Sequence, residues 1–281
     1  MDLKERQNLS QLFWRYLWSS ILISVSSTLG TIVDGAIVGN LIGESGVSAI
    51  NLSAPMVQLM FTLSFILAAG AGMIIGYALG EKDMSRVRYV YTLSMGSSLV
   101  VGLLFSMGGL FFSDTISGML CNNESLFPYT RDYLRVILIG SPTFMILWAM
   151  STLIGVDGSP RLASVALVVD NVVNLMLDVV FIRVFDWGIA GASTATVVGH
   201  IVGIVIMLYH FYGKENHLYF SLKHKQPEWG NIISQGAPLA IASVGLTLLL
   251  LSANHIFLST QGEKGIFIFA ICMNLLQIYN L

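Results

Sequence analysis

Long apolar runs separated by short charged islands form the main pattern of the chain. The runs are continuous, whereas the strands of a membrane barrel alternate polar and apolar positions over about ten residues. A run of about 20 apolar residues is long enough to cross a bilayer as a helix. Several runs exceed this length, so tilted or kinked helices are expected. The predicted spans are 12–40, 53–80, 89–113, 126–156, 162–185, 189–212, 232–260 and 265–281.

The composition points to the same class of protein. Of the 281 residues, 55% are hydrophobic and 11% are charged, and the mean hydropathy is +0.75. Soluble domains carry about a quarter charged residues, and disorder requires low hydrophobicity, so both classes are excluded. The net charge of -2 argues against a nucleic-acid partner. The sequence therefore predicts an all-α, polytopic helical membrane protein whose surroundings are the lipid bilayer.

The distribution of Lys and Arg predicts the orientation. With a cytoplasmic N-terminus, the inner side receives ten of the 14 basic residues. The outer side then receives Arg131, Arg135, Arg183 and Lys264. Cytoplasmic loops carry the excess of positive charge, so an N-terminus inside the cell is favoured. We expect a multi-pass protein of a cell membrane, most naturally a bacterial one.

A short segment is repeated at an offset of 219 residues. Gly-Glu-Ser-Gly-Val at 43–47 returns as Gly-Glu-Lys-Gly-Ile at 262–266. Such weak symmetry is typical of transport folds built from two similar halves, although chance similarity between two polar turns is the alternative. The pattern predicts a six-helix lobe at 1–212, a cytoplasmic linker at 213–231 and the first one or two helices of an incomplete second lobe at 232–281. A complete protein would then have roughly 440 residues, and this chain would be truncated at its C-terminus.

Polar groups inside apolar helices are the candidate functional residues, because they are costly in hydrocarbon. Asp34 lies in the first span, and Asn174 and Asp178 lie on one face of the fifth because they are four residues apart. Thr196 lies in the sixth span. From the helical rise of 1.5 Å per residue, Asp34, Asp178 and Thr196 are each expected roughly 10 Å below the outer surface. Three helices from distant parts of the chain are thus expected to present oxygen atoms at one level.

These oxygen atoms indicate a site for a cation or a proton. Hard cations prefer carboxylate, amide and hydroxyl ligands, and two poorly solvated carboxylates repel each other unless a positive ion intervenes. We therefore predict a cation- or proton-binding site made of Asp34, Asn174, Asp178 and Thr196. The alternative is structural, since acids and amides also form hydrogen bonds between neighbouring helices.

Two further polar residues extend the same region. Asp170 continues the face of Asn174 and Asp178 one turn inward, and it is either a second proton position or a solvated acid. His200 lies one turn beyond Thr196, and we interpret it as a packing residue.

The sequence carries no enzyme signature, so no catalytic residue and no cofactor are predicted. The P-loop, HExxH, GxSxG and CxxC patterns are absent from it. Cys121 and Cys272 are far apart and indicate neither a disulfide framework nor a metal site. The only metal ion that the sequence suggests is Na⁺ at the predicted cation site.

Several segments, in this order and spacing, resemble the MATE family (multidrug and toxic compound extrusion), and most closely its bacterial DinF/MepA-like members. They are Asp-Gly-Ala-Ile-Val-Gly at 34–39, Gly-Glu-Lys-Asp at 80–83, Gly-Ser-Pro at 158–160, Asn-x-x-x-Asp at 174–178 and Gly-Ile-Ala-Gly-Ala-Ser-Thr-Ala-Thr at 188–196. The resemblance covers essentially the whole chain. It implies a two-lobe, twelve-helix antiporter that exports cationic or amphipathic small molecules in exchange for H⁺ or Na⁺. It also implies an ion site at Asp34, Asn174, Asp178 and Thr196.

The chain departs from the family pattern in two places. Leu-Ile-Gly-Val at 153–156 stands near the turn where many members carry an Arg, and the span 232–260 lacks the acid that some branches use there. A flippase for a lipid-linked precursor is one alternative, but it would need cationic residues for phosphate, and the spans contain few. A non-transporting remnant is the other. The sequence leaves H⁺ and Na⁺ open and predicts no particular oligomeric state.

Overall fold

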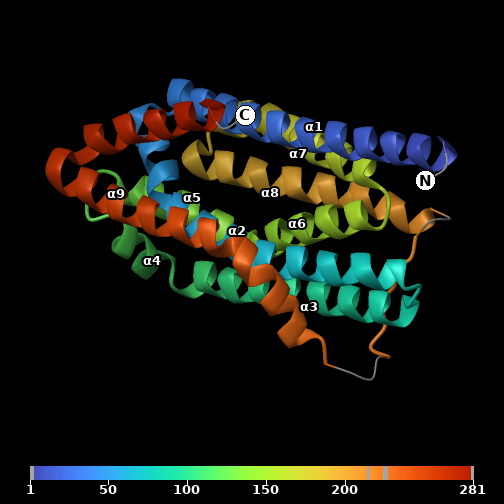
Figure 1. Ribbon diagram of the computed structural model, residues 1–281. Coiled ribbons are helices and arrows are strands. Elements are labelled where there is room, and N and C mark those ends of the chain that lie inside the picture. Colours follow the sequence, from blue (N-terminus) through green and yellow to red (C-terminus); the bar gives the residue numbers. More distant parts are fainter. Residues whose placement is uncertain (1–2, 214–215, 224–226, 280–281) are drawn as a thin grey trace.

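The protein is a bundle of long helices that lie side by side (Figure 1). A computed structural model describes residues 3–213, 216–223 and 227–279, and these residues form helices and loops without a strand. The helices are α1 (Leu3–Leu41), α2 (Glu44–Gly80), α3 (Met84–Phe111), α4 (Ser113–Leu120), α5 (Phe127–Ile139), α6 (Ser141–Val156), α7 (Pro160–Val179), the π-helical turn η1 (Val180–Val184), α8 (Gly188–Met207), the 3₁₀ turn η2 (Leu208–Tyr212) and α9 (Trp229–Tyr279). Six of them are long and apolar enough to cross a membrane, and the bent pair α5–α6 would make a seventh span. The predicted all-α, polytopic class is confirmed.

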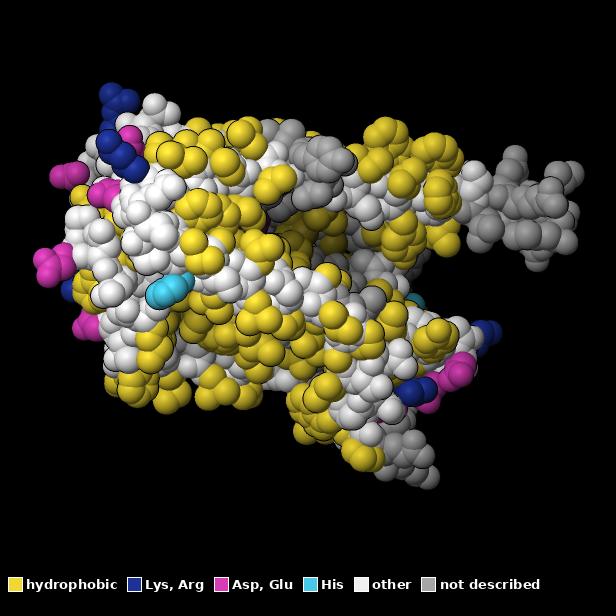
Figure 2. All heavy atoms as spheres, turned by 60° about the vertical axis from the view of Figure 1, so that its left-hand side comes forward, with side chains coloured by type: hydrophobic (Ala, Val, Ile, Leu, Met, Phe, Trp, Pro, Cys, Tyr) yellow, Lys and Arg dark blue, Asp and Glu magenta, His cyan; other side chains and the backbone are white. Residues whose placement is uncertain are grey.

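The outer surface of the bundle is built for lipid. Figure 2 shows charged side chains gathered at the two ends of the visible face and hydrophobic side chains between them. Large apolar groups such as Leu104 and Ile241 are 62% and 70% exposed. The interior is also apolar, with Ile75, Tyr91 and Leu153 fully buried between α2, α3 and α6. Apolar residues therefore occur both inside the bundle and on its outer surface, unlike in a soluble domain, because lipid hydrocarbon surrounds the outside.

The predicted span 126–156 is wrong as a single helix. It is a pair, α5 and α6, bent by 53° between Ile139 and Ser141. Pro142 has no N–H to continue the α5 hydrogen-bond ladder. The hydroxyl of Ser141 instead donates to the carbonyl oxygens of Leu138 (2.6 Å) and Gly102 (2.7 Å). The short helix α4 was not predicted either, because the predicted span 89–113 runs past Phe112, where α3 ends and α4 begins.

The predicted spans 232–260 and 265–281 are the two arms of α9. They are divided by Gly262, whose φ of 64° is outside the helical range, and Figure 1 shows the second arm running back along the bundle. Gly43, the equivalent residue of the repeated segment, also has a positive φ, of 98°. The two loops touch, since the hydroxyl of Ser45 donates to Glu263 Oε1 at 2.6 Å. The repeated glycines therefore share one backbone role, a turn that residues with a Cβ rarely adopt.

The connection between α8 and α9 is tied to one end of the bundle. Asp157 is buried and accepts from the backbone N–H of His217 at 2.9 Å, and its carboxylate also contacts the His210 ring at 2.8 Å. At the other end of the connection, Glu228 pairs with Arg86 of α3 at 2.8 Å. The described part of this segment is thus held by buried polar contacts at both ends.

Helices α2 and α9 form the most extensive contact between helices. They approach most closely at two glycines. A Cβ on Gly236 would overlap the carbonyl oxygen of Ile66, and one on Gly70 would overlap that of Ile232. Small residues that allow backbones to touch are a common means of association in membranes, where apolar burial gives little driving force.

This crossing predicts a strong and local response to one added methyl group. We expect Gly236→Ala to destabilise the protein by about 1–3 kcal/mol, because backbone atoms must move apart. Gly245→Ala on the same helix is the matched control, since a Cβ there meets no atom within 4 Å. The Gly245→Ala protein should be as stable as the unaltered protein or up to about 1 kcal/mol more stable, because Ala favours a helix over Gly. Thermal unfolding in detergent measures both, and equal stability of the two variants would contradict the close crossing.

Candidate ion site and its cavity

The carboxyl groups of Asp34 and Asp178 lie in hydrogen-bonding contact with each other. Asp34 comes from α1 and is partly exposed, whereas Asp178 near the end of α7 is fully buried. Both oxygen atoms of Asp178 are without a donor from the described residues. Two ionised carboxylates have no hydrogen to share, so this contact becomes favourable when one of them is protonated or when a cation joins them.

Close packing of α1 against α7 brings the two acids together. The helices run in the same direction, because Gly30, one turn before Asp34, lies against Asn171, two turns before Asp178. A Cβ on Gly30 would lie 2.7 Å from Asn171 Oδ1, so only a glycine leaves room for this amide. The amide of Asn171 also donates to Ser26 at 3.3 Å. The glycine and the polar pair below it thus set the register of the acid pair.

Asn174 and Thr196 form a second pair, one turn before Asp178 along α7. The amide Nδ2 of Asn174 donates to the hydroxyl oxygen of Thr196 at 3.2 Å, and that hydroxyl donates to the Ala192 carbonyl at 3.1 Å. Because Asn174 precedes Asp178 by one turn, Thr196 lies about 6 Å deeper than Asp178. The four predicted residues therefore occupy two adjacent levels, and the expectation of a single level for Asp34, Asp178 and Thr196 is wrong by one turn.

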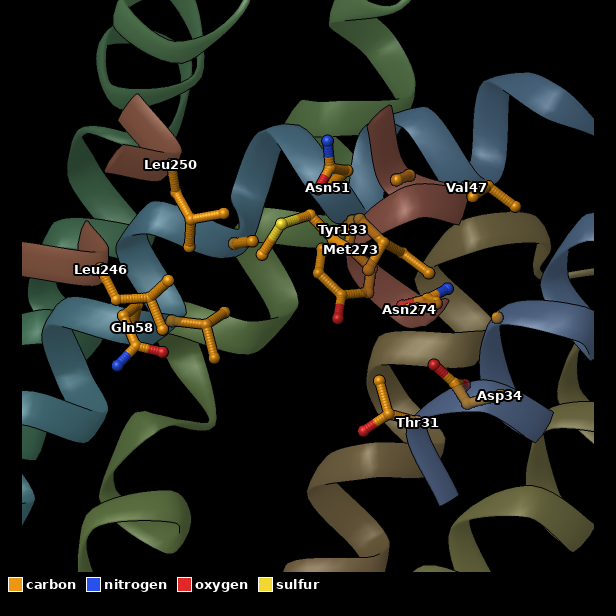
Figure 3. Close-up of a pocket in the computed structure, with 15 residues that line it drawn as sticks. Thr31, Asp34, Val47, Asn51, Gln58, Tyr133, Leu246, Leu250, Met273 and Asn274 are labelled. Carbon is orange, nitrogen blue, oxygen red and sulfur yellow. The ribbon is translucent and has the colours of Figure 1, made fainter. Parts of the chain in front are cut away.

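Tyr133 is a member of the site that the sequence analysis missed. It lies on α5, is buried, and is close enough to Asp34 and Asp178 to interact with their charges. Figure 3 shows its ring reaching into the space between α1 and α2. A tyrosine between Arg131 and Arg135 looks like part of a charged helix end, so no pattern in the sequence singles it out.

A cavity of about 260 Å³ opens beside the acid pair, between α1, α2, α5 and α9. Asp34 and Thr31 lie at one side with Asn274 of the second arm of α9 next to them, and Leu246 of the first arm lies at the opposite side (Figure 3). Its described lining is Thr31, Asp34, Gly35, Val47, Ile50, Asn51, Ala54, Val57, Gln58, Tyr133, Leu246, Leu250, Ala270, Met273 and Asn274. Asp34 is the single carboxylic acid among them, and none is Lys, Arg or His. The cavity thus combines apolar walls, several amides and one acid.

Amides from α2 and α9 join the cavity walls. Asn51 and Asn254 are buried and paired twice, since Asn51 Nδ2 donates to Asn254 Oδ1 at 3.1 Å and Asn254 Nδ2 donates to the Asn51 carbonyl at 2.9 Å. The second arm of α9 comes close to α1, where Asn274 Nδ2 would be 3.1 Å from a Cβ on Gly35. Asn254 lies in the predicted span 232–260, and nothing near it in the sequence indicates that Asn51 is its partner.

The remaining polar candidates are accounted for separately. His200 packs edge-on against the ring of Phe144, with 5.6 Å between the ring centres, as expected of a packing residue. Its Nδ1 atom is buried, and no described residue bonds to it. Cys121 and Cys272 are both free thiols.

A multi-pass helical bundle with acids beside an internal cavity is an arrangement typical of membrane transport proteins. The MatE family model matches residues 19–180, more than half of the sequence, and the chain belongs to this family. The family contains export proteins rather than enzymes, as the sequence predicted.

Characterised relatives are similar over most of this chain. The multidrug export protein MepA of Staphylococcus haemolyticus is 27% identical over 259 residues, which cover 90% of this chain and 57% of that protein. MepA of Staphylococcus aureus strain MRSA252 is 25% identical over 236 residues, or 82% and 52% of the two chains. The chain spans little more than half the length of these relatives.

Solved structures share the fold. The MATE multidrug transporter DinF-BH in complex with R6G aligns with a TM-score of 0.84 and 23% identity, covering 92% of this chain and 59% of that chain. An inward-facing multidrug resistance MATE transporter aligns with a TM-score of 0.79 and 21% identity, covering 86% and 56%. At these identities the likeness concerns the fold alone.

The Asn174–Thr196 hydrogen bond predicts a difference between two substitutions of Thr196. Thr196→Val removes the acceptor and leaves the amide unpaired between α7 and α8, which we expect to cost about 1–3 kcal/mol of stability. Thr196→Ser keeps the hydroxyl and is expected to change stability by less. Thermal unfolding in the same detergent compares them, and identical unfolding temperatures would show that the bond contributes nothing.

Proposed function

We propose that the chain is the ion-binding part of an exporter for cationic or amphipathic small molecules, driven by H⁺ or Na⁺. The observation that carries this proposal is the position of Asp34, which belongs to the acid pair with Asp178 and also lines the cavity. An ion and a substrate would then meet the same carboxyl group.

The proposed mechanism is competition between ion and substrate. An ion held by Asp34 and Asp178, with Asn174 and Thr196 one turn below, would neutralise the pair and favour one access state. A cationic substrate in the cavity would favour the other, because it interacts with Asp34 when the pair is charged. The ion gradient would then drive release of substrate on the outer side.

The coupling ion follows from the same oxygen atoms. The carboxylates, the amide and the hydroxyl suit Na⁺, and the direct contact between Asp34 and Asp178 suits a shared proton. In either case the N-terminus is proposed to be cytoplasmic, with residues 1–212 as one lobe, 213–231 as the linker and 232–281 as the start of a second lobe.

The lining of the cavity bears on the substrate class. A flippase for a lipid-linked precursor would require positive charge for its phosphate groups, and the described lining residues include no Lys, Arg or His. One acid among apolar and amide side chains favours a cationic or amphipathic compound.

The acid pair predicts loss of coupling on removal of either charge. In a two-lobe protein that includes this chain, we expect Asp34→Asn and Asp178→Asn each to lower ion-driven efflux at least tenfold, because a neutral amide neither takes up a proton nor supplies negative charge for Na⁺. Dye efflux from bacterial cells that lack other exporters is the measurement. Asp114→Asn is the control, since this outer acid is 76% exposed. Unchanged drug resistance with both site substitutions present would refute the proposed role.

The cavity predicts a preference for positive charge. A cationic rhodamine should bind the purified protein at least tenfold more tightly than an anionic fluorescein of similar size. Asp34→Asn should remove most of this difference, because it removes the single acid of the lining. Fluorescence polarisation measures both affinities. Equal binding of the two dyes by the unaltered protein would count against a cationic substrate.

A further inference from the structure

We propose that Asp170 is a second proton-binding position, in the middle of α7 between the Asp34–Asp178 pair and the cytoplasmic end of the bundle. This proposal rests on the proposed function, with H⁺ as the coupling ion. The carboxyl group lies two turns inward of Asp178, or about 12 Å along the helix. Its ligand is a single proton.

The first observation is the isolation of this acid. Asp170 is only 8% exposed. No described residue forms a hydrogen bond or an ion pair with its carboxyl group, and no charged side chain is close enough to act on it. An ionised carboxylate in such surroundings is strongly disfavoured, whereas a protonated one carries no charge and needs only weak contacts.

The second observation is a slot in α8 that fits the carboxyl group. A Cβ on Gly199 would lie 2.6 Å from Asp170 Oδ1, so a side chain at position 199 would collide with the acid. One turn further along α8, a Cβ on Gly203 would lie 3.3 Å from the Cβ of Asp170. Two glycines on one face thus make room for a polar side chain where α7 and α8 would otherwise close on each other.

The chemistry of the slot favours a proton over Na⁺. Hard cations collect about six oxygen ligands, but the slot offers one carboxyl group between two glycines. The nearest amide on the same face, Asn174, already donates to Thr196. The Asp34–Asp178 pair, which supplies two carboxylates, suits either ion, so the two positions differ in selectivity.

The position of Asp170 also suits transfer along α7. Asp170 and Asp178 lie two turns apart on one face of α7, and chains of acidic side chains carry protons in pumps and transporters. The titratable residues on the elements packed against α7 are Arg15, Tyr16 and Asp34 on α1, His200 on α8 and Arg183 on η1, among the side chains that the structure describes. Arg15 and Tyr16 bond to the carbonyls of Gly158 and Gly155 at the inner end. His200 is the one titratable neighbour at this depth, and its ring lies on Phe144.

Infrared difference spectroscopy of the purified protein tests the proposal, because the carbonyl stretch of a protonated carboxyl group is separate from the bands of carboxylates. Spectra are recorded from about pH 5 to about pH 10. We expect one protonated-carboxyl band that disappears on raising the pH and is absent from Asp170→Asn. Asp170→Glu, which keeps the acid, should retain a shifted band. Asp114→Asn, at an exposed site, is the control and should leave the band unchanged.

The outcomes separate this proposal from the proposed function. Identical spectra of the unaltered protein and Asp170→Asn at every pH would overturn the inference, and so would an Asp170 band that never titrates. Loss of the band on adding Na⁺ at constant pH would assign the position to Na⁺ and overturn it as well. Bands lost in Asp34→Asn or Asp178→Asn report on the acid pair alone, so failure at Asp170 leaves that site standing.

Discussion

The structure depends on one electrostatic constraint, which is that acids lie inside the helical bundle with no base beside them among the described residues. Two unit charges about 4 Å apart repel by about 4 kcal/mol at an effective dielectric constant near 20. Asp34 and Asp178 are in contact, and no described donor reaches Asp178. A structural ion pair would have placed an Arg or Lys next to them. The pair therefore repels itself unless a proton or a cation neutralises it, and the proposed ion coupling rests on this repulsion.

Glycines decide where these acids can lie. Gly30 admits Asn171 beneath the acid pair, and Gly199 admits the carboxyl group of Asp170. In both cases a Cβ would occupy the space that the polar group now fills. Close helix approach in membranes thus serves two purposes here, because it holds the bundle together and forms the slots in which polar side chains are kept from lipid. The crossing of Gly70 and Gly236 serves only the first purpose.

The sequence was sufficient for features that follow from local rules and insufficient for those that need a tertiary partner. Hydropathy predicted the long helices because a bilayer demands about 20 apolar residues, and counting residues along helices selected Asp34 and Asp178 before their contact was known. The bend at Gly140 was missed because the apolar run continues across it from the end of α5 into α6. Tyr133 and the partner of Asn254 were missed because nothing near them in the sequence reports which helix lies opposite. The predicted depth of Thr196 relative to Asp178 was wrong by one turn, because counting residues from a predicted helix end carries an error of that size.

The cavity connects the proposed ion site with the proposed transport of a substrate. Its walls come from α1, α2, α5 and both arms of α9, and the buried amides of Asn51 and Asn254 join α2 to the first arm of α9. Asp34 is the one acid that faces this space and also contacts Asp178. Any ion that neutralises the pair changes the charge of the cavity, and any cation in the cavity changes the affinity of the pair for its ion. Such coupling is reciprocal by thermodynamic necessity. A mobile α9 would convert it into a change of access, because the cavity exists only while α9 is packed against α1 and α2.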